Sequence, residues 1–396
     1  MKTIAQINER IKKGEAVVLT ADEVVEFAEK NGVEAVAKEV DVVTTATFGA
    51  MCSSGAFLNF GHADPPIRMT KILLNDVPAY GGLAAVDTYI GATECSLSEG
   101  IKYGGAHVIE DLVAGKPIKL EATSPGTDCY PRREITTYLT LDSINQAYLY
   151  NPRNAYQNYS CAVNTSDKVI HTYMGTLLPR MGNATYATSG QLSPLLNDPY
   201  YRTIGMGTRI FLGGGIGYVA WEGTQHNPLA NRTENGVPTA GAGTMAVIGN
   251  LRGMSTEFLR AATFTNYGTT LYVGIGVPIP VLDEEMARFV CVRDEEIVTN
   301  VYDYSVGRRS RPSLAQVNYK ELRSGQIEIQ GKKIRTAPLS SLAKAQKIAD
   351  LLKGWIVDGK FTLTEPIMGL PKSRVNTPLD IIGPDEIPVE EEEEIG

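Results

Sequence analysis

The chain of 396 residues has few of the side chains that bind metals or form disulfides, with only four histidines and five cysteines. No two histidines lie four residues apart and no Cys-x-x-Cys occurs, so the grouped ligands of structural zinc sites and cysteine-bound iron–sulfur clusters are missing. We therefore expect no metal within the chain, although ligands distant in sequence could still converge. Cysteines odd in number and widely scattered do not predict a disulfide framework, and they favour a reducing cytoplasm.

Long apolar runs and an excess of positive charge are also missing. No stretch of about 18 uncharged apolar residues occurs, and the charged N-terminus does not resemble a signal peptide. The net charge is −8, but eight of the acids lie at Asp380, Asp385, Glu386 and 390–394. The remaining chain is charge-balanced, which argues against a nucleic-acid partner. We expect a soluble cytoplasmic protein whose residues 372–396 form a disordered acidic tail.

Alternating helix and strand patterns predict an α/β fold, with glycine-rich loops around a central sheet system. Ile4, Ile7 and Ile11 indicate an opening helix, and Thr20 begins a capping box. Residues 1–310 are expected to form the catalytic domain, and 311–371 a small α+β appendage. We expect further helices over 33–39, 142–153, 256–262, 283–289 and 342–355. We expect strands over 17–19, 41–46, 72–74, 84–90, 108–113, 118–122, 270–274, 326–329, 332–336 and 361–363.

Cys129 lies in an unusual polar turn, Ser-Pro-Gly-Thr-Asp-Cys-Tyr-Pro-Arg-Arg over 124–133. Proline and glycine before the thiol predict a turn, and Arg132 and Arg133 place two positive charges beside it. Positive potential favours the thiolate, which is the nucleophilic form. The segment therefore indicates a reactive cysteine, with an ordinary surface thiol as the alternative.

Cys52 follows the β-branched strand pattern of 41–46 and is surrounded by small residues, among them Gly49, Ser53 and Gly55. In α/β proteins such a strand end commonly supplies ligand-binding amides. We expect Cys52 and Ser53 at a binding site, and a packing cysteine is the alternative.

The glycine run over 213–217 matches neither dinucleotide nor Walker patterns. Tight turns that let backbone approach backbone are its more common use, but the amides of Gly214 and Gly215 could also hold a substrate carboxylate, as could Arg132 or Arg133. A Cys–His hydrolase with His62 or His226 as base is conceivable. Two cysteines in special loops fit sulfur transfer better, because hydrolysis needs one thiol.

Three segments, 46–62, 123–133 and 213–226, resemble the homocysteine biosynthesis protein family of methanogens and anaerobic bacteria, over about residues 2–371. The resemblance implies a sulfurtransferase that makes L-homocysteine from L-aspartate 4-semialdehyde, with Cys52 and Cys129 functional and Cys129 holding the persulfide. Many archaeal members continue into CBS domains, and we expect a form without them. The family also implies a separate ferredoxin-type iron–sulfur protein as electron source.

Electron counting supports an external reductant, because replacing an aldehyde oxygen by a thiol consumes electrons and the chain shows no flavin or nicotinamide fingerprint. We expect sulfur on Cys129 to add to the aldehyde, Cys52 to release the product by exchange, and His62 to donate a proton. This scheme requires both sulfurs in one pocket. The alternatives are a cysteine-dependent acyl or CoA-type transferase and a non-catalytic binding protein, and a homodimer is plausible in each case.

Overall fold

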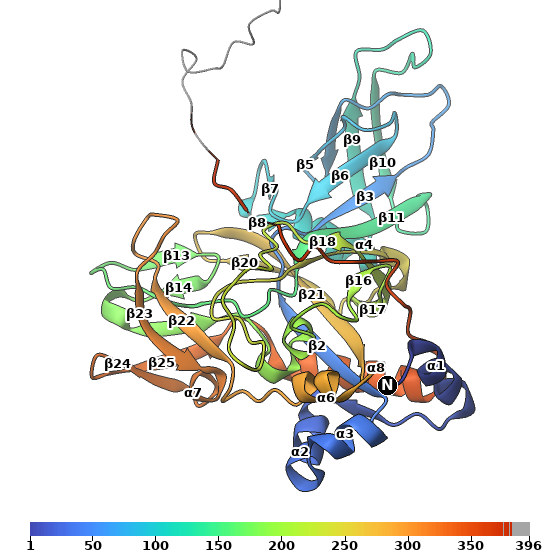
Figure 1. The fold of residues 1–396 in the computed structure, drawn as a ribbon. Helices are drawn as coiled ribbons and strands as arrows, with labels where there is room; N and C mark the ends of the chain where they lie inside the picture. Colours follow the sequence, from blue (N-terminus) through green and yellow to red (C-terminus); the bar gives the residue numbers. More distant parts are fainter. Residues whose placement is uncertain (375, 380, 382–396) are drawn as a thin grey trace, which may run out of the picture.

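The computed structural model describes residues 1–374, 376–379 and 381, and all eight acids of the tail expected over 372–396 lie outside the described residues. Its centre is a ten-stranded mixed sheet that confirms the α/β class (Figure 1). The strands in spatial order are β1 (Val18–Thr20), β2 (Val42–Ala50), β21 (Gly268–Pro280), β17 (Arg209–Leu212), β18 (Gly215–Glu222), β19 (Met245–Asn250), β11 (Gln146–Asn154), β3 (Gly55–Asn59) and β6 (Asp87–Gly91), with β20 (Leu259–Phe264) beside β21.

Helices pack around the β1–β2–β21 end of this sheet (Figure 1). They are α1 (Ile4–Lys13), α2 (Ala21–Asn31), α3 (Val33–Glu39), α6 (Glu284–Val290) and α8 (Leu342–Val357). The expected apolar stripe of α1 is buried, and Thr20 forms the expected capping box with Glu23. Ser341 caps α8, whose apolar side lies against β2 and β21.

A second sheet of six strands joins distant parts of the sequence. Its order is β23 (Ser313–Asn318), β22 (Val298–Asp303), β12 (Cys161–Val163), β15 (Asn183–Tyr186), β25 (Lys332–Pro338) and β24 (Gln326–Ile329). The expected hairpin over 326–336 is confirmed as β24–β25. Residues 311–371 are nevertheless no separate appendage, because their strands share this sheet with β12, β15 and β22 while α8 covers the central sheet.

An arm projects from the body (Figure 1). It consists of the β3, β6 and β11 edge of the central sheet and a four-stranded sheet ordered β10 (Glu134–Leu139), β9 (Ile118–Thr123), β4 (Lys71–Leu74) and β5 (Val77–Ala79). Its apolar residues belong to the same hydrophobic core as the body. We call the loops 60–70 and 124–133 the arm tip.

The remaining elements are short, with the exception of α4 (Gly105–Val113). They are β7 (Cys95–Ser96), β8 (Gly100–Gly104), β13 (Ile170–Thr172), β14 (Gly175–Leu177), β16 (Gly205–Met206), β26 (Met368–Gly369), α5 (Pro194–Asn197) and α7 (Tyr319–Arg323). No helix among the described residues is long and apolar enough to cross a membrane.

Four expected elements are wrong. The strand over 108–113 is part of helix α4, whose buried Val108, Ile109 and Leu112 follow a helical spacing. The helix over 142–153 is strand β11, where buried and exposed positions alternate and Tyr148 points outward. The helix over 256–262 is strand β20, held by β21, and residues 361–363 form no strand.

Candidate active site

Cys52 lines a cavity of about 300 Å³ where β2 ends and β3 begins. The walls come from the end of β2, the segment after β11, the loop after β15 and the β20–β21 turn. Polar side chains that line it include Cys52, Ser53, Arg153, Tyr159, Tyr173, Thr188, Ser193 and Tyr267. Cys52 and Ser53, which we expect at a binding site, both line this cavity.

Hydrogen bonds fix the turn that presents Cys52. The amide of Met51 donates to Leu271 O at 2.8 Å, and that of Ser54 to Met51 O at 3.0 Å. Asn151, wholly buried, donates to Ser54 Oγ at 2.8 Å and accepts from Ser53 Oγ at 3.1 Å. The thiol itself accepts a hydrogen bond from Thr270 Oγ1 at 3.2 Å.

Arg153 supplies the positive charge of the cavity. Among the described residues, no carboxylate lies within ion-pair distance of its guanidinium. A half-buried arginine without an acidic partner beside a cavity is suited to bind an anionic substrate group. Sequence reasoning missed Arg153 because it placed the residue at the end of a helix; no local pattern marks it.

Four tyrosines also line the cavity, Tyr156, Tyr159, Tyr173 and Tyr267. Tyr159 donates to Tyr173 Oη at 3.1 Å, and Tyr173 to Tyr304 Oη at 3.2 Å. Burial raises the pKa of Tyr159 and Tyr304 well above the usual value, so both stay protonated at neutral pH. Burial, together with the Cys52 charge, also raises the pKa of Tyr267. The protons of Tyr159 and Tyr173 are used within this chain of hydroxyls, so of these two and Tyr267 it is Tyr267 that can donate a hydrogen bond to a ligand.

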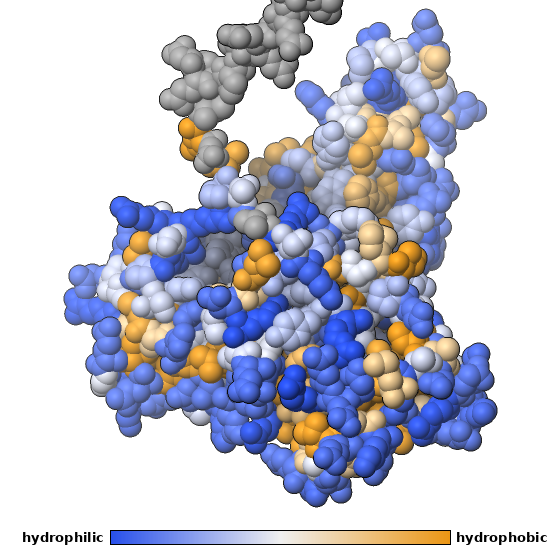
Figure 2. All heavy atoms as spheres, in the orientation of Figure 1, coloured by the Kyte–Doolittle hydropathy of each residue, from blue (hydrophilic) through white to orange (hydrophobic). Residues whose placement is uncertain are grey.

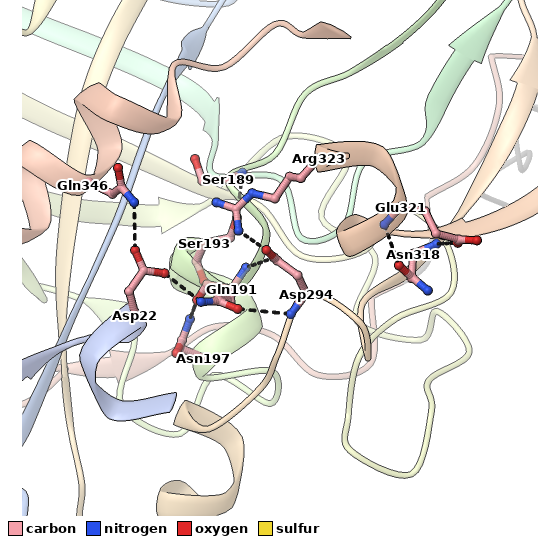
Figure 3. A network of polar contacts seen from close by, with 10 residues as sticks. All are labelled: Asp22, Ser189, Gln191, Ser193, Asn197, Asp294, Asn318, Glu321, Arg323 and Gln346. Atoms are coloured by element: carbon pink, nitrogen blue, oxygen red, sulfur yellow. Dashed lines mark hydrogen bonds and ion pairs between the residues drawn. The ribbon is translucent and has the colours of Figure 1, made fainter. Parts of the chain in front are cut away.

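A partly buried polar network holds the wall that contains Thr188 and Ser193 (Figure 3). Gln191 donates its amide N–H to Asp294 at 2.9 Å and its side-chain amide to Asp22 at 2.7 Å. Arg323, the last residue of α7, forms an ion pair with Asp294. The network thus ties this wall to the helices α2 and α7.

The arm tip contains Cys129. This exposed cysteine lies in a turn closed by mutual backbone hydrogen bonds of 2.9 and 3.1 Å between Thr127 and Tyr130. Arg132 donates to the carbonyls of Asp64 and Pro65 at 2.8 and 2.9 Å and so joins the two tip loops.

Two further expected site residues lie at the arm tip. The ring of His62 stacks on Tyr130 at 6.1 Å. Arg133 lies against Gly126 in the same loop as Cys129. The structure thus brings Cys129, His62, Arg132 and Arg133 together, and none of the four lines the Cys52 cavity.

Strand β3 separates the two cysteines. Cys52 lies before the first residue of β3, Gly55, and the arm tip with His62 lies after its last residue, Asn59. The four residue steps from Gly55 to Asn59 span about 14 Å in an extended strand. A disulfide needs Cα atoms within about 7 Å. The prediction that one chain gathers both sulfurs in a single pocket is therefore wrong for this structure, and so is His62 as proton donor in the Cys52 cavity.

Gly214 and Gly215 also lie elsewhere. They form the β17–β18 turn, where Gly214 has a φ of +109° and a Cβ on Gly215 would lie 2.5 Å from Gly253 O. These glycines serve close backbone packing and do not line the cavity. His226 is buried, its ring nitrogens lie 3.1 and 3.0 Å from the carbonyls of Thr244 and Pro371, and burial lowers its pKa.

Cys161 and Cys291 are poor nucleophiles. Burial raises the pKa of Cys161 and of Cys291 to about 12, so both thiols stay protonated at neutral pH. Neither lines the cavity. Among the residues that the structure describes, no three His, Cys, Asp or Glu side chains are placed to hold a metal ion.

A family model described as "homocysteine biosynthesis enzyme, sulfur-incorporation" matches residues 16–363. The chain belongs to this family. A relative in Methanosarcina acetivorans named L-aspartate semialdehyde sulfurtransferase is 55% identical over 92% of this chain and 71% of the relative. A second of that name, in Methanocaldococcus jannaschii, is 54% identical over 93% and 73%. No solved structure matches the chain. The chain is thus a transferase of the family that incorporates sulfur in homocysteine biosynthesis.

Proposed function

We propose that this enzyme converts L-aspartate 4-semialdehyde to L-homocysteine and that the Cys52 cavity is the substrate site. The main support is that Cys52 lies in one small cavity with Arg153, whose guanidinium has no carboxylate partner among the described residues. Both relatives reported above are named L-aspartate semialdehyde sulfurtransferase, and these names support aspartate semialdehyde as the substrate. A cavity of about 300 Å³ also suits a small amino acid.

Arg153 pairs with the α-carboxylate of the substrate, because carboxylates are bound well by a guanidinium fork. The aldehyde then lies toward Cys52. Tyr267, held protonated by its raised pKa, donates the proton that the aldehyde oxygen needs when sulfur adds to the carbon. This assignment replaces His62, which lies at the arm tip.

Sulfur arrives as a persulfide on Cys129. Its terminal sulfur adds to the aldehyde carbon, and the resulting alkoxide takes a proton from Tyr267. The Cys52 thiolate attacks the Cys129 sulfur and breaks the sulfur–sulfur bond, leaving a Cys52–Cys129 disulfide and the hydroxythiol of the substrate. Loss of water gives a thioaldehyde. Two electrons with two protons reduce it to homocysteine, and two more of each reduce the disulfide.

The four electrons of one turnover come from outside the chain. A ferredoxin-type iron–sulfur protein is the proposed donor, because a low-potential one-electron carrier can reduce both the thioaldehyde and the disulfide. Exposed Cys129 is accessible to a protein that delivers sulfur or electrons.

An anaerobic assay with aspartate semialdehyde, polysulfide prepared from sulfide and elemental sulfur, and a low-potential reductant tests the proposal by measuring homocysteine. Polysulfide transfers a sulfur atom to the Cys129 thiolate by exchange and so forms the persulfide without a further oxidant. Arg153→Ala should raise KM for the semialdehyde at least tenfold, because a charge-assisted pair is lost. Arg335→Ala, on exposed β25, is the matched control and should leave KM unchanged. No homocysteine from the wild type, or equal KM values for the two variants, contradicts the proposal.

A further inference from the structure

The two halves of the sulfur-transfer site lie at opposite ends of one strand. Cys52 and the cavity lie before β3, and Cys129 with the arm tip lies beyond its far end, about 14 Å or more away. The strand cannot shorten, because β11 and β6 pair with it residue by residue from Gly55 to Asn59. Within one chain, the exchange between the two sulfurs is therefore out of reach.

An exposed aromatic surface connects these two ends. Phe57 of β3 lies directly opposite Tyr148 of β11 and Tyr89 of β6. Directly paired residues point to the same side of a sheet, as do residues two apart, so Tyr150 shares this side. Tyr150 lies opposite Ile248, which lies opposite Tyr218. We call these residues, Phe57, Tyr89, Tyr148, Tyr150, Ile248 and Tyr218, the aromatic face.

The aromatic face is open to solvent in the single chain. Phe57, Tyr148 and Tyr218 are 37%, 39% and 45% exposed, whereas Ala147 and Leu149 on the other side of β11 are fully buried. The space-filling view shows apolar residues along the arm and mainly hydrophilic ones at its far end (Figure 2). Aromatic side chains exposed in contact with one another are typical of a protein interface.

We infer that a second copy of this chain covers the aromatic face and that its Cys129 completes the Cys52 cavity. The inference rests on the proposed function, because that chemistry requires both sulfurs. Symmetry supports the choice of a second copy. A two-fold axis across the aromatic face pairs the two arms in opposite directions, so the tip of each lies at the cavity end of the other. One axis thereby forms two complete sites, each with Cys52 from one chain and Cys129 from its partner.

Heterodimers with different affinity tags, purified by both tags in sequence, test the arrangement. In a Cys52→Ala/Cys129→Ala pairing, with one substitution in each chain, a shared site predicts about half of wild-type activity, because one of the two sites stays intact. In a pairing of wild type with the doubly substituted chain, it predicts no activity, because each site then lacks one cysteine. If each chain contained its own complete site, the first pairing would be inactive and the second would keep about half of the wild-type activity.

A readout without substrate separates this inference from the proposed function. Mild oxidation of a mixture of ¹⁵N-labelled and unlabelled protein should give Cys52–Cys129 peptides that join one labelled and one unlabelled chain. If such peptides form but the protein makes no homocysteine, the dimer arrangement is supported and the proposed function is contradicted. Failure to recover any doubly tagged dimer, or disulfides only within single chains, overturns the arrangement.

Discussion

Cysteine residues in this enzyme differ in their surroundings, and these surroundings determine their reactivity. Cys129 is exposed in a turn, whereas Cys161 is fully buried in β12. With a pKa of about 12, Cys161 has only about one thiolate in ten thousand molecules at pH 8. Cys129 should therefore be alkylated by iodoacetamide within minutes at pH 8, and Cys161 should not react in the native protein.

Peptide mass spectrometry after short exposure measures this difference. Unfolding in guanidinium is the control, because all five cysteines should then react at similar rates. Native labelling of Cys161 as fast as Cys129 would contradict the prediction. Sequence reasoning could rank these thiols, since the turn residues and arginines around Cys129 are visible in the sequence. It could not find Arg153, whose position in the cavity depends on the pairing of β11 with β3.

At the scale of elements, the loop between β15 and α5 shows how a cavity wall is kept in place. Gly190 in this loop has a φ of +59°, and a Cβ there would lie 2.2 Å from Asp294 Oδ1. Gly190→Ala should therefore lower the free energy of unfolding by at least about 1–2 kcal/mol, the cost of a left-handed backbone with a side chain. It should also raise KM, because Thr188 and Ser193 line the cavity.

Urea unfolding and steady-state kinetics measure the two effects. Gly307→Ala is the matched control, because a Cβ there meets no atom within 4 Å and its φ is ordinary. A variant of Gly190 as stable as that control would show that the network of Figure 3 does not hold this wall.

Helix α6 provides a prediction about pH. Its N-cap Asp283 accepts two hydrogen bonds from Arg202, at 2.9 and 2.6 Å. The guanidinium lowers the pKa of Asp283 from 3.8 to about 2. A carboxylate with a lowered native pKa stabilises the fold above its unfolded pKa and loses that effect as the pH falls. Asp283→Asn should therefore be less stable than wild type at pH 6.

The difference should shrink as the pH falls from about 4 toward 2, because the unfolded chain binds a proton at Asp283 below pH 3.8 whereas the native carboxylate does so only near pH 2. Urea midpoints at pH 6, 4 and 3 measure it. Glu284→Gln, on the next residue of the helix, controls for the loss of one negative charge. A difference that stays constant over this range would contradict the role of the Arg202 pair.

At the scale of the whole molecule, local patterns predicted much of the helical layer but not how the sheets are assembled. Capping boxes and apolar spacing identify α1, α2 and α8, since these signals lie within a few residues. Strand β11 was assigned to a helix because only its neighbours β3 and β19 reveal the alternation of buried and exposed positions. The distance between Cys52 and Cys129 is likewise set by long-range pairing, which single-sequence reasoning does not supply.

The shared site makes activity depend on a surface far from the chemistry. Tyr148→Glu places a charge in the centre of the aromatic face, and a buried unpaired carboxylate strongly opposes association. The variant should therefore become monomeric in sedimentation experiments and lose homocysteine formation together with dimerisation. Val357→Glu is the control, since Val357 is 51% exposed at the end of α8, away from the arm (Figure 1). It should remain dimeric and active.

Thermal unfolding of both variants shows whether each chain stays folded. Measurements at increasing protein concentration test whether the Tyr148 variant is inactive because it dissociates. Its association is weakened, and by mass action a higher concentration restores the dimer. Its specific activity should rise with concentration, in step with the dimer fraction, whereas that of the Val357 variant should stay constant. A folded monomer with full specific activity at every concentration would show that each chain assembles its own site, by a movement of the arm that brings Cys129 to Cys52.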